Sequence, residues 1–255
     1  MTMKTRVALV TGGATGIGRA TCVALAQRGI DEIHIGYSRS VDAAESLSAE
    51  LRDLGAAAFP LRIDVSDREA VEEAAARMLQ TSGGLDVLVN CAGTTRKIEF
   101  TDLAALTPDI WDEILGTNLL GAFWVCQAFA GALTERRGSI VNVSSISATR
   151  VVGSSMPYSV SKAALSQLTR ALAVALAPAV RVNSVAPGTV VSGWHERLVG
   201  EADARAGFEA EAQLVPLGRL AGPAEIADAI ASVALELGFM TGQELIVDGG
   251  KALRY

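Results

Sequence analysis

The sequence predicts an α/β fold in which one parallel sheet is doubly wound, with helices on both of its faces, within a single domain. Short apolar runs rich in β-branched residues alternate with helix-period patterns along the chain, and this alternation is typical of parallel sheets. Each parallel connection needs a crossover, which is usually a helix. A chain of 255 residues has a size at which α/β folds routinely form one domain.

The apolar runs predict strands at 7–10, 33–37, 57–63, 86–89, 138–145, 180–185 and 245–247. Pro60 in the third of these runs suits an edge strand, because proline donates no hydrogen bond to a neighbouring strand. Helices are expected after the glycines of 12–18 and at 40–54, 67–81, 107–132, 158–176 and 223–237. Ser40 and the pair Thr107-Pro108 resemble helix N-termini.

Composition and charge argue against several classes of protein. The net charge is -6 and the basic residues form no stripe, so no nucleic-acid partner is expected. No run reaches the about 18 apolar residues of a membrane span, and residues 1–6 lead into a strand rather than a signal-peptide core, so we expect a cytoplasmic protein and no membrane partner. Three widely spaced cysteines and two histidines predict neither a disulfide framework nor a metal site.

A glycine-rich turn follows the first expected strand. Gly12, Gly16 and Gly18 lie between that strand and a helix. Glycine permits close backbone approach, and a helix N-terminus offers free N–H groups to phosphate. The turn therefore predicts a dinucleotide site at the carboxyl end of the sheet. The alternative is an ordinary turn, because the spacing departs from G-x-G-x-x-G.

A second group of polar residues follows the fifth expected strand. Tyr158 and Lys162 are four positions apart, so a helix places the phenol and the ammonium on one face. A nearby positive charge lowers the pKa of a tyrosine, which is ordinarily about 10. Ser145 would supply a hydroxyl to the substrate. Taken alone, the Tyr-x-x-x-Lys pair could also lie on an ordinary solvated helix face.

Two other features concern the surroundings of this group. Asn118 is polar within an apolar helical pattern, which indicates either a site residue or a side chain bonded to neighbouring backbone. The stretch 189–216 is long and rich in helix-forming residues, so we expect a mobile helical lid over a site. His34 is expected in the core or at an interface.

These segments together resemble the short-chain dehydrogenase/reductases, in the single-domain branch that includes 3-oxoacyl-(acyl carrier protein) reductases and sugar or steroid dehydrogenases. The resemblance covers nearly the whole chain. It implies a Rossmann-type, seven-stranded parallel sheet and a homotetramer or homodimer. The motifs that carry it are Thr11-Gly-Gly-Ala-Thr-Gly-Ile-Gly18, Asp64-Val65, Asn90-Cys-Ala-Gly93, Asn118, Ser145, Tyr158-Ser-Val-Ser-Lys162, Pro187-Gly188, Pro216-Leu-Gly-Arg219 and Val247-Asp-Gly-Gly250.

The resemblance implies hydride transfer between a nicotinamide and a carbonyl or secondary alcohol. Tyr158 would act as general acid/base, and Lys162 would lower the pKa of Tyr158 and bond the nicotinamide ribose. Ser145 would orient the carbonyl, on whose oxygen negative charge develops. Asn118 would hold a water of the proton relay.

The resemblance also implies binding residues. Cofactor contacts are expected, besides Tyr158 and Lys162, for Gly12, Thr15, Gly16, Ile17, Gly18, Tyr37, Ser38, Arg39, Asp64, Val65, Asn90, Ala92, Gly93, Pro187, Gly188, Val190 and Ser192. Of these, Asp64 and Val65 are expected beside the adenine, Asn90, Ala92 and Gly93 on the adenosine side, and Val190 at the nicotinamide amide. The residues expected to face the substrate are Ser145, Ser147, Gly153, Met156, Tyr158, Trp194 and His195. Cys91 stands where asparagine is commoner in the family, and Ser192 where threonine is commoner.

NADP(H) is expected as the preferred cofactor, with NAD(H) as the alternative. Selective NAD binders of this fold carry an acid at the end of the second strand. Tyr37 stands there instead, and Ser38 and Arg39 could bond a 2′-phosphate. Against this, Thr15 stands where many NADP-dependent relatives carry Arg or Lys.

The expected partners are a small-molecule carbonyl or alcohol and further copies of the chain. Association would bury the apolar region around Phe239, Met240 and 245–247. Two other functions stay open at this point. One is a 3-oxoacyl-(acyl carrier protein) reductase, to whose docking surface Arg136 and Arg137 could contribute. The other is a non-catalytic dinucleotide sensor, although such proteins usually lose the Tyr or the Lys that this chain keeps.

Overall fold

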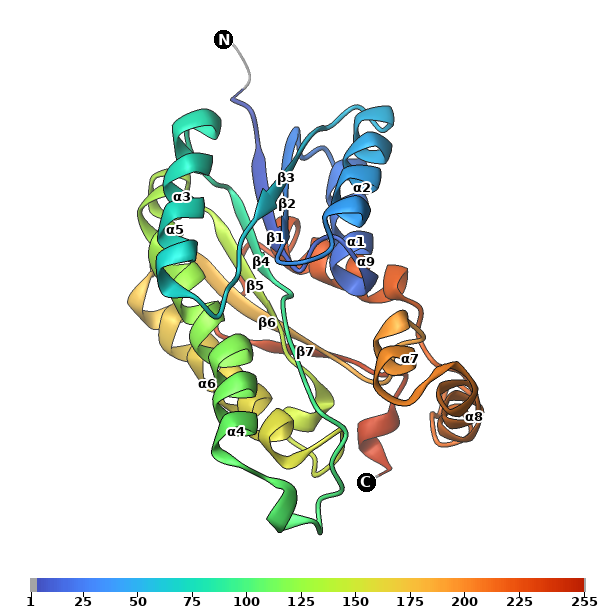
Figure 1. Ribbon diagram of the computed structural model, residues 1–255. Helices are drawn as coiled ribbons and strands as arrows, with labels where there is room; N and C mark the ends of the chain where they lie inside the picture. The colour runs from blue at the N-terminus through green and yellow to red at the C-terminus, as the bar shows by residue number, and fades with distance from the viewer. Residues whose placement is uncertain (1–3, 255) are drawn as a thin grey trace.

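The computed structural model describes residues 4–254 as a seven-stranded sheet with helices on both faces (Figure 1). All neighbouring strands are parallel, and their order is β3-β2-β1-β4-β5-β6-β7. The strands are β1 (Val7–Thr11), β2 (Glu32–Tyr37), β3 (Ala57–Arg62), β4 (Val87–Asn90), β5 (Ser139–Val143), β6 (Arg181–Pro187) and β7 (Glu244–Val247). The predicted Rossmann-type, doubly wound, single-domain α/β fold is confirmed. Residues 1–3, which entered the expectation about the N-terminus, lie outside the described part.

Helices connect these strands. They are α1 (Gly16–Gln27), α2 (Val41–Asp53), α3 (Arg68–Ser82), α4 (Pro108–Leu115), α5 (Ala122–Arg136), α6 (Met156–Ala175), α7 (Gly193–Val199), α8 (Glu201–Ala212) and α9 (Pro223–Leu235). A π-helical segment, η2 (Gly116–Gly121), joins α4 to α5, and the 3-10 helices are η1 (Leu103–Ala105), η3 (Ile146–Ala148) and η4 (Lys251–Leu253). In Figure 1, α1, α2 and α9 lie on one side of the sheet and α3, α5 and α6 on the other.

The side chains of β1 alternate between two cores. Ala8 and Val10 belong to the apolar cluster that includes α1, α2 and α9, whereas Val7 and Leu9 belong to the cluster that includes α3 and α5. All four are fully buried, because a central strand of a sheet covered on both faces has no solvent side. This explains why the strand is apolar without alternation in the sequence.

The strand order reverses between β1 and β4. Val10 of β1 is opposite Ile35 of β2 on one side and Val89 of β4 on the other. The last residues of the two central strands, Thr11 and Asn90, are also partners. Ligands of doubly wound sheets bind at the carboxyl ends of the strands at this point, so the glycine turn and the motif after β4 meet where a ligand is expected.

Two element boundaries near the expected catalytic group differ from the prediction. The fifth strand ends at Val143, because Ser145 is the N-cap of η3 and accepts a hydrogen bond from the Ser147 amide. The next helix begins at Met156 rather than at 158, with Pro157 in its first turn. Proline is tolerated there because the amides of a first turn have no helical acceptor.

Prolines mark the edge of the sheet and the end of a strand. Pro60 lies in β3, which pairs with β2 alone, so its predicted edge position is confirmed. Pro187 closes β6, whose predicted end was 185. The carboxyl end of β6 therefore lies directly beside the loop expected to bind the nicotinamide.

The helix predicted over 107–132 contains a π-helical segment in its middle, at Gly116–Gly121. Gly121 passes so close to the loop after β3 that a Cβ there would lie 2.7 Å from the Val65 carbonyl oxygen. Segments of this kind often occur at functional sites, and Asn118 lies within this one. Hydrophobic periodicity carries no signal for such an interruption, which is why the prediction missed it.

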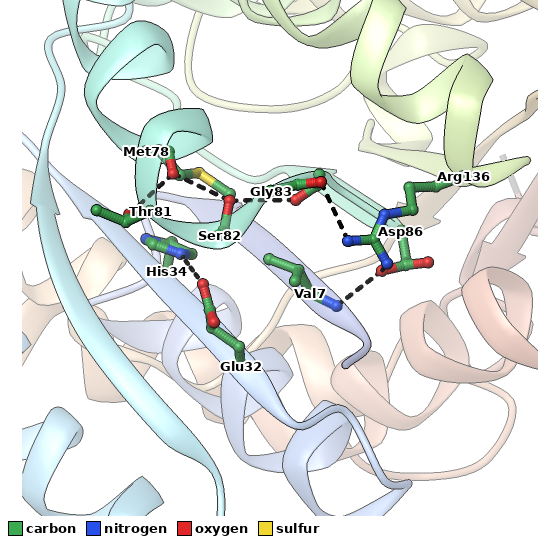
Figure 2. A network of polar contacts seen from close by, with 10 residues as sticks. Val7, Glu32, His34, Met78, Thr81, Ser82, Gly83, Asp86 and Arg136 are labelled. Carbon is green, nitrogen blue, oxygen red and sulfur yellow. Dashed lines mark hydrogen bonds and ion pairs between the residues drawn. The ribbon is translucent and has the colours of Figure 1, made fainter. Parts of the chain in front are cut away.

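A buried arginine holds the amino-terminal edge of the sheet (Figure 2). Arg136 donates to the Thr5 carbonyl oxygen at 3.1 Å and to the Gly83 carbonyl oxygen at 3.2 Å. Asp86 beside it accepts from the Val7 amide at 2.9 Å. Because the guanidinium is bonded inside the protein, Arg136 is not available for the acyl-carrier docking surface considered above.

His34 is a core residue, one of the two expectations for it. Its ring is buried, stacks on Phe59, and lies with Nε2 2.7 Å from Glu32 Oε1 (Figure 2). Burial lowers the pKa of His34, although the nearby Glu32 carboxylate acts in the opposite direction. The histidine therefore belongs to the packing of β2 and β3 and not to the carboxyl edge of the sheet.

One helical stretch, Pro108–Arg136, is long and apolar enough to cross a membrane by length and composition alone. Its inner face packs on the sheet through Val125, Cys126, Phe129 and Leu133, all of which are buried. A core helix of a folded α/β domain passes the same test, so the stretch is weak support for a membrane span.

Candidate active site

The glycine turn after β1 forms a cradle that excludes side chains. A Cβ on Gly12 would lie 2.9 Å from the Ala92 Cα, and one on Gly18 would lie 2.2 Å from the Gly12 carbonyl oxygen. Gly12 and Gly16 have φ values of 64° and 54°, in the left-handed region that favours glycine. A ligand can therefore approach this backbone more closely than side chains would permit.

The N-terminus of α1 opens toward the same turn. Thr15 is its N-cap residue but makes no side-chain hydrogen bond to the helix amides. Unpaired N–H groups and the positive end of the helix dipole favour a phosphate group. The cradle and the helix end together fit the pyrophosphate of a dinucleotide, and the predicted residues that form them are Gly12, Thr15, Gly16, Ile17 and Gly18.

Thr11 connects the glycine turn to the motif after β4. Its hydroxyl accepts hydrogen bonds from the Cys91 amide at 3.1 Å and the Ala92 amide at 3.2 Å. Burial raises the pKa of the Cys91 thiol to about 11, so this cysteine is neutral at physiological pH. No role was predicted for Thr11, although it directly follows the first predicted strand.

The Asn90 side chain is bonded within the sheet. Its Nδ2 donates to Asn142 Oδ1 of β5 at 2.9 Å, and Asn142 Nδ2 donates to Thr169 Oγ1 of α6 at 2.8 Å. All three residues are buried. The chain of polar groups ties β4, β5 and α6 together, so Asn90 serves the site by fixing the strand that carries Ala92 and Gly93.

Tyr37 ends β2, and Ser38 and Arg39, the residues expected near a 2′-phosphate of the cofactor, follow it directly. The Gly13 amide donates to the Gly36 carbonyl oxygen at 2.8 Å, which holds the end of β2 against the glycine turn. Tyr37 is half-buried, and Ser38 and Arg39 are exposed. Both exposed side chains are therefore accessible to a group bound next to the turn.

Asp64 and Val65 follow β3. The Asp64 carboxylate accepts hydrogen bonds from the Ser66 amide at 3.0 Å and the Ser66 hydroxyl at 2.6 Å. Val65 is buried. The carboxylate is thus oriented at the surface while its neighbour anchors the loop, an arrangement compatible with the expected adenine contact.

Tyr158 and Lys162 lie one turn apart on α6, and Ser145 lies at the end of β5. The Lys162 ammonium is 5.6 Å from the centre of the Tyr158 ring and donates to the Val143 carbonyl oxygen at 2.8 Å. Ser145 accepts from the Ser147 amide and donates to the Ser147 hydroxyl, both at 3.1 Å. The side chains predicted to carry the chemistry are therefore brought together and held in orientation.

The surroundings raise the pKa of Tyr158 rather than lower it. Burial raises this pKa to about 12, and the Ser145 hydroxyl acts in the opposite direction. Burial also lowers the pKa of Lys162 to about 8. Desolvation therefore outweighs any lowering of the Tyr158 pKa by Lys162, and the expected effect of the lysine on this pKa stays a prediction. The ammonium is bonded to the Val143 carbonyl, and desolvation disfavours the charged form of both groups.

Asn118 holds the loop that follows Gly93. Its Oδ1 accepts from the Thr94 amide at 2.8 Å, and its Nδ2 donates to the Thr94 carbonyl oxygen at 3.0 Å. Nδ2 also donates to the Ser161 hydroxyl at 3.0 Å, and that hydroxyl donates to the Tyr158 carbonyl oxygen at 2.7 Å. The Asn118 side chain is therefore bonded to backbone, as one of the two interpretations predicted, and that backbone follows Gly93. Its role in the reaction stays a prediction.

Gly93 lies where several predicted residues converge. A Cβ at this position would lie 3.3 Å from Asn118 Oδ1, 3.9 Å from Lys162 Nζ and 3.9 Å from Trp194 Cη2. These three side chains come from η2, α6 and α7. The absence of a side chain at Gly93 thus leaves space at the centre of the site.

The end of β6 and the loop after it carry four residues expected to bind the cofactor, Pro187, Gly188, Val190 and Ser192, of which Val190 is expected at the nicotinamide amide. A Cβ on Gly188 would lie 2.9 Å from Asp248 Cβ, so this part of the loop packs tightly on the turn after β7. Val190 is buried and pairs with Ala221. Ser192 is the N-cap residue of α7. The loop therefore joins the sheet directly to the predicted lid.

Three of the residues expected beside the substrate adjoin one another. A Cβ on Gly153 would lie 2.7 Å from Ser147 Oγ and 3.5 Å from Tyr158 Cδ1, and the φ of Gly153 is 114°. Met156 is half-buried at the start of α6. Gly153 therefore lies between Ser147 and the Tyr158 ring, and the expected substrate contacts of this group stay predictions.

His195 does not join the other predicted substrate residues. Its ring packs edge-on against Phe208 of α8, with ring centres 5.3 Å apart, and burial lowers its pKa. Within residues 4–254, His195 Nδ1 is buried without a hydrogen-bond partner. The half-buried His195 therefore packs between α7 and α8 rather than lying as a solvated lid residue, and its expected substrate contact stays a prediction.

An open pocket of about 420 Å³ adjoins the loop that Asn118 holds. Its lining residues are Thr95, Arg96, Lys97, Ile98, Glu113 and Leu198. Arg96 and Glu113 form an ion pair at 2.7 Å. Because Leu198 belongs to α7, the pocket lies between this loop and the lid.

A cradle for a dinucleotide beside a grouped tyrosine, lysine and serine defines a dinucleotide-dependent oxidoreductase of the doubly wound fold. Residues 12–252 match a protein-family model described as enoyl-(acyl carrier protein) reductase. Together with the relatives below, this match shows that the chain belongs to the short-chain dehydrogenase/reductase family, whose members are NAD(P)-dependent oxidoreductases acting on CH–OH or C=O groups. Within residues 4–254, no group of three or more His, Cys, Asp or Glu residues could hold a metal ion.

Three relatives illustrate the similarity. Ketoacyl reductase 2 of the granaticin polyketide synthase of Streptomyces violaceoruber is 41% identical over 248 residues, which are 97% of this chain and 96% of that protein. A short-chain dehydrogenase/reductase structure from Burkholderia xenovorans has a TM-score of 0.90 at 33% identity and covers 98% of both chains. A gluconate 5-dehydrogenase from Burkholderia cenocepacia, in complex with NADP and tartrate, has a TM-score of 0.88 at 31% identity, covering 99% of this chain and 97% of that one.

Proposed function

We propose that the chain is an NADP(H)-preferring carbonyl reductase or secondary-alcohol dehydrogenase that acts on a small molecule and works as a homo-oligomer. One observation is the main support for the proposed reaction. Ser145, Tyr158 and Lys162 lie together at the carboxyl end of β5, and the space at Gly93 adjoins Lys162. This arrangement supports the catalytic roles expected for the three side chains.

The proposed chemistry follows from the charge that develops during reduction. Bound NADP(H) supplies the hydride to the carbonyl carbon, so negative charge grows on the carbonyl oxygen and requires a positioned proton donor. Burial raises the pKa of Tyr158 to about 12, which keeps the phenol protonated and able to donate. Ser145, held by Ser147, offers a second hydrogen bond to the same oxygen.

Lys162 stabilises the tyrosine after proton transfer. Its pKa, lowered by burial to about 8, leaves the ammonium mainly charged at pH 7. An ammonium near the ring favours the phenolate that forms when Tyr158 gives up its proton. The N–H groups that do not bind Val143 can donate to the ribose of the cofactor. We also assign Asn118 the water of the proton relay, because Asn118 reaches the Tyr158 backbone through Ser161.

The first prediction concerns the proton donor. Tyr158→Phe removes the phenol hydroxyl and keeps the packing of the ring, so kcat should fall by about 10²- to 10⁴-fold while the dissociation constant for NADP(H) stays within about twofold. Nicotinamide absorbance with a panel of ketones and secondary alcohols measures turnover, and fluorescence titration measures binding.

Tyr37→Phe is the matched control, because it removes a phenol hydroxyl at the adenosine end. Because Tyr37 is expected to contact the cofactor, any effect of this variant should fall on KM for NADP(H), whereas kcat at saturating cofactor should equal that of the unmodified chain. A fall in kcat of only about twofold in Tyr158→Phe, with chemistry rate-limiting, would contradict the assignment. An unmodified chain that binds NADP(H) and turns over no member of the panel would favour the non-catalytic sensor instead.

The preference for NADP(H) rests on the end of β2. Positions 37 to 39 hold no carboxylate that would accept the ribose hydroxyls and repel a 2′-phosphate. Arg39 and Ser38 are exposed there, and a planar guanidinium forms strong hydrogen bonds to phosphate oxygens. Thr15, which lacks a charge, argues in the other direction. The cofactor seen in the gluconate 5-dehydrogenase structure is NADP.

The second prediction tests this preference. Arg39→Ala should weaken kcat/KM for NADP(H) by on the order of 1.5 to 3 kcal/mol, the contribution of a charge-assisted contact, and leave the value for NAD(H) nearly unchanged. Arg77→Ala on α3 provides a matched loss of an exposed arginine and should change neither value. Equal losses for both cofactors in Arg39→Ala, or an unmodified chain that favours NAD(H), would overturn the proposal.

The oligomer is proposed from the apolar surface around β7. Phe239 is fully exposed and Leu245 and Ile246 are also exposed, whereas Met240 and Val247 pack partly on the core. β7 pairs with β6 alone, so its outer edge carries unpaired backbone groups. Exposed apolar patches and open strand edges are usually covered in folded proteins, and a second copy of the chain would cover both.

The third prediction is that light scattering at micromolar concentrations gives a multiple of the 26.4 kDa monomer mass. Phe239→Asp should raise the dissociation constant of the oligomer at least about tenfold, because a charge replaces an aromatic anchor. Leu103→Asp, which alters another exposed leucine, is the control and should not. A monomer mass across the whole concentration range would refute the proposal.

A 3-oxoacyl-(acyl carrier protein) reductase remains the alternative enzyme, although its expected basic contact at Arg136 is taken up inside the protein. The cytoplasmic location and the mobility of the lid stay predictions. Activity toward a carrier-bound 3-oxoacyl group and not toward free ketones would select the alternative enzyme.

A further inference from the structure

A buried lysine joins the lid to the loop after β6. Lys251, in η4, is 6% exposed, and its ammonium donates to Glu211 Oε2 at 2.7 Å and to Thr189 Oγ1 at 2.9 Å. Glu211 lies on α8, and Thr189 lies between Gly188 and Val190 in the loop expected beside the nicotinamide. Three segments that are distant in the sequence therefore meet at one ammonium.

The backbone that carries Lys251 is held in place. The Asp248 carboxylate accepts from the Gly250 amide at 2.8 Å and from the Ala252 amide at 2.6 Å. Gly188 packs so closely on Asp248 that a Cβ would lie 2.9 Å from its Cβ. The lysine thus extends from a hydrogen-bonded turn that packs on the base of the loop, and its ammonium reaches α8 from there.

Burial stabilises the ion pair of Lys251 and Glu211 against separation. An ammonium withdrawn from water costs several kcal/mol unless a partner of opposite charge compensates it. Burial alone would raise the pKa of Glu211, but the hydrogen bonds from Lys251 and Thr189, with the charge of Lys251, hold it below its usual value. Glu211 is therefore ionised at neutral pH, and the ion pair is present under physiological conditions.

Fixing α8 also fixes α7. The two helices are separated by Gly200 alone, and His195 of α7 packs on Phe208 of α8. Trp194, next to His195, lies beside Gly93, with Cη2 3.9 Å from the position of a Cβ there. A continuous set of contacts thus runs from Lys251 through α8 and α7 to the centre of the site.

We propose that Lys251 is a positioning residue, which with Glu211 and Thr189 forms a latch that closes the lid and the nicotinamide loop as one unit. The inference rests on the proposed function for the assignment of that loop. It goes beyond the catalytic group because none of the three latch residues needs to touch the reacting atoms. The latch sets how long Trp194 stays over the site and how well cofactor and substrate are held.

The experiment compares Lys251→Met, Glu211→Gln and the double variant, with Lys251→Arg as the conservative replacement. Glu209→Gln is the matched control, because it removes a carboxylate from the same helix that pairs with Arg205 at the exposed surface. All variants carry Trp111→Phe and Trp124→Phe, which leaves Trp194 as the remaining one of three tryptophans. Acrylamide quenching of its fluorescence reports lid closure without turnover, and steady-state kinetics report KM and kcat.

We expect both single variants to expose Trp194 to quencher at least about twofold more than the control and to lower kcat/KM by on the order of 10- to 100-fold, mainly through KM. The double variant should lose no more than the worse single variant, because the two residues act as one pair, and Lys251→Arg should recover most of the loss.

Quenching in Glu211→Gln equal to that in Glu209→Gln, or losses that add in the double variant, would overturn the latch. Glu211→Gln keeps the shape of the side chain and serves as the deciding variant if Lys251→Met does not fold. If the unmodified chain turned over no carbonyl compound, the proposed function would fail, and the quenching comparison would still decide whether the latch exists.

Discussion

The burial of a charged lysine beside a tyrosine is the constraint on which the site depends. Lys162 is 5% exposed, and its ammonium is held by the carbonyl oxygen of Val143 at the end of β5. An ammonium removed from water is tolerated only where backbone oxygens or opposite charges replace the lost hydration. The end of a parallel strand exposes such a carbonyl, because the following residues leave the sheet. The doubly wound fold thus provides both the place and the acceptor for the lysine.

The rest of the site accommodates the buried lysine and the half-buried tyrosine through close backbone packing. Gly93 leaves space beside Lys162, Asn118 and Trp194, and Gly12 lets the dinucleotide cradle lie against the motif after β4. The lid then reaches the same space from the other side through Trp194. The low dielectric that shifts the pKa values of the tyrosine and the lysine is therefore a product of the whole arrangement. A water-filled version of the same residues would have ordinary pKa values and a weaker electrostatic effect on the developing charge.

Sequence reasoning recovered what depends on local pattern and left out what depends on tertiary contact. Period and spacing in the sequence predict the alternation of strands and helices, the glycine turn and the pairing of Tyr158 with Lys162. The structure contains all three. The π-helical segment around Asn118 has no periodicity signal, because it depends on the approach of the helix to Val65. The direction of the Tyr158 pKa shift depends on burial, which a sequence shows only indirectly. Lys251 had no local signal, since its partners lie 40 and 62 positions away.

The most direct measurement of this constraint is the pH dependence of the free energy of unfolding. Burial lowers the pKa of Lys162 to about 8 from 10.5, so between these values the unfolded chain binds one more proton than the folded chain. Stability must then rise with pH, by up to about 1.4 kcal/mol per unit relative to Lys162→Met, in urea titrations between pH 8 and 10. Lys97→Met removes a half-exposed lysine, and its curve of unfolding free energy against pH should run parallel to that of the unmodified chain. If the curve for Lys162→Met also ran parallel to that of the unmodified chain, Lys162 would not be a buried ammonium with a lowered pKa.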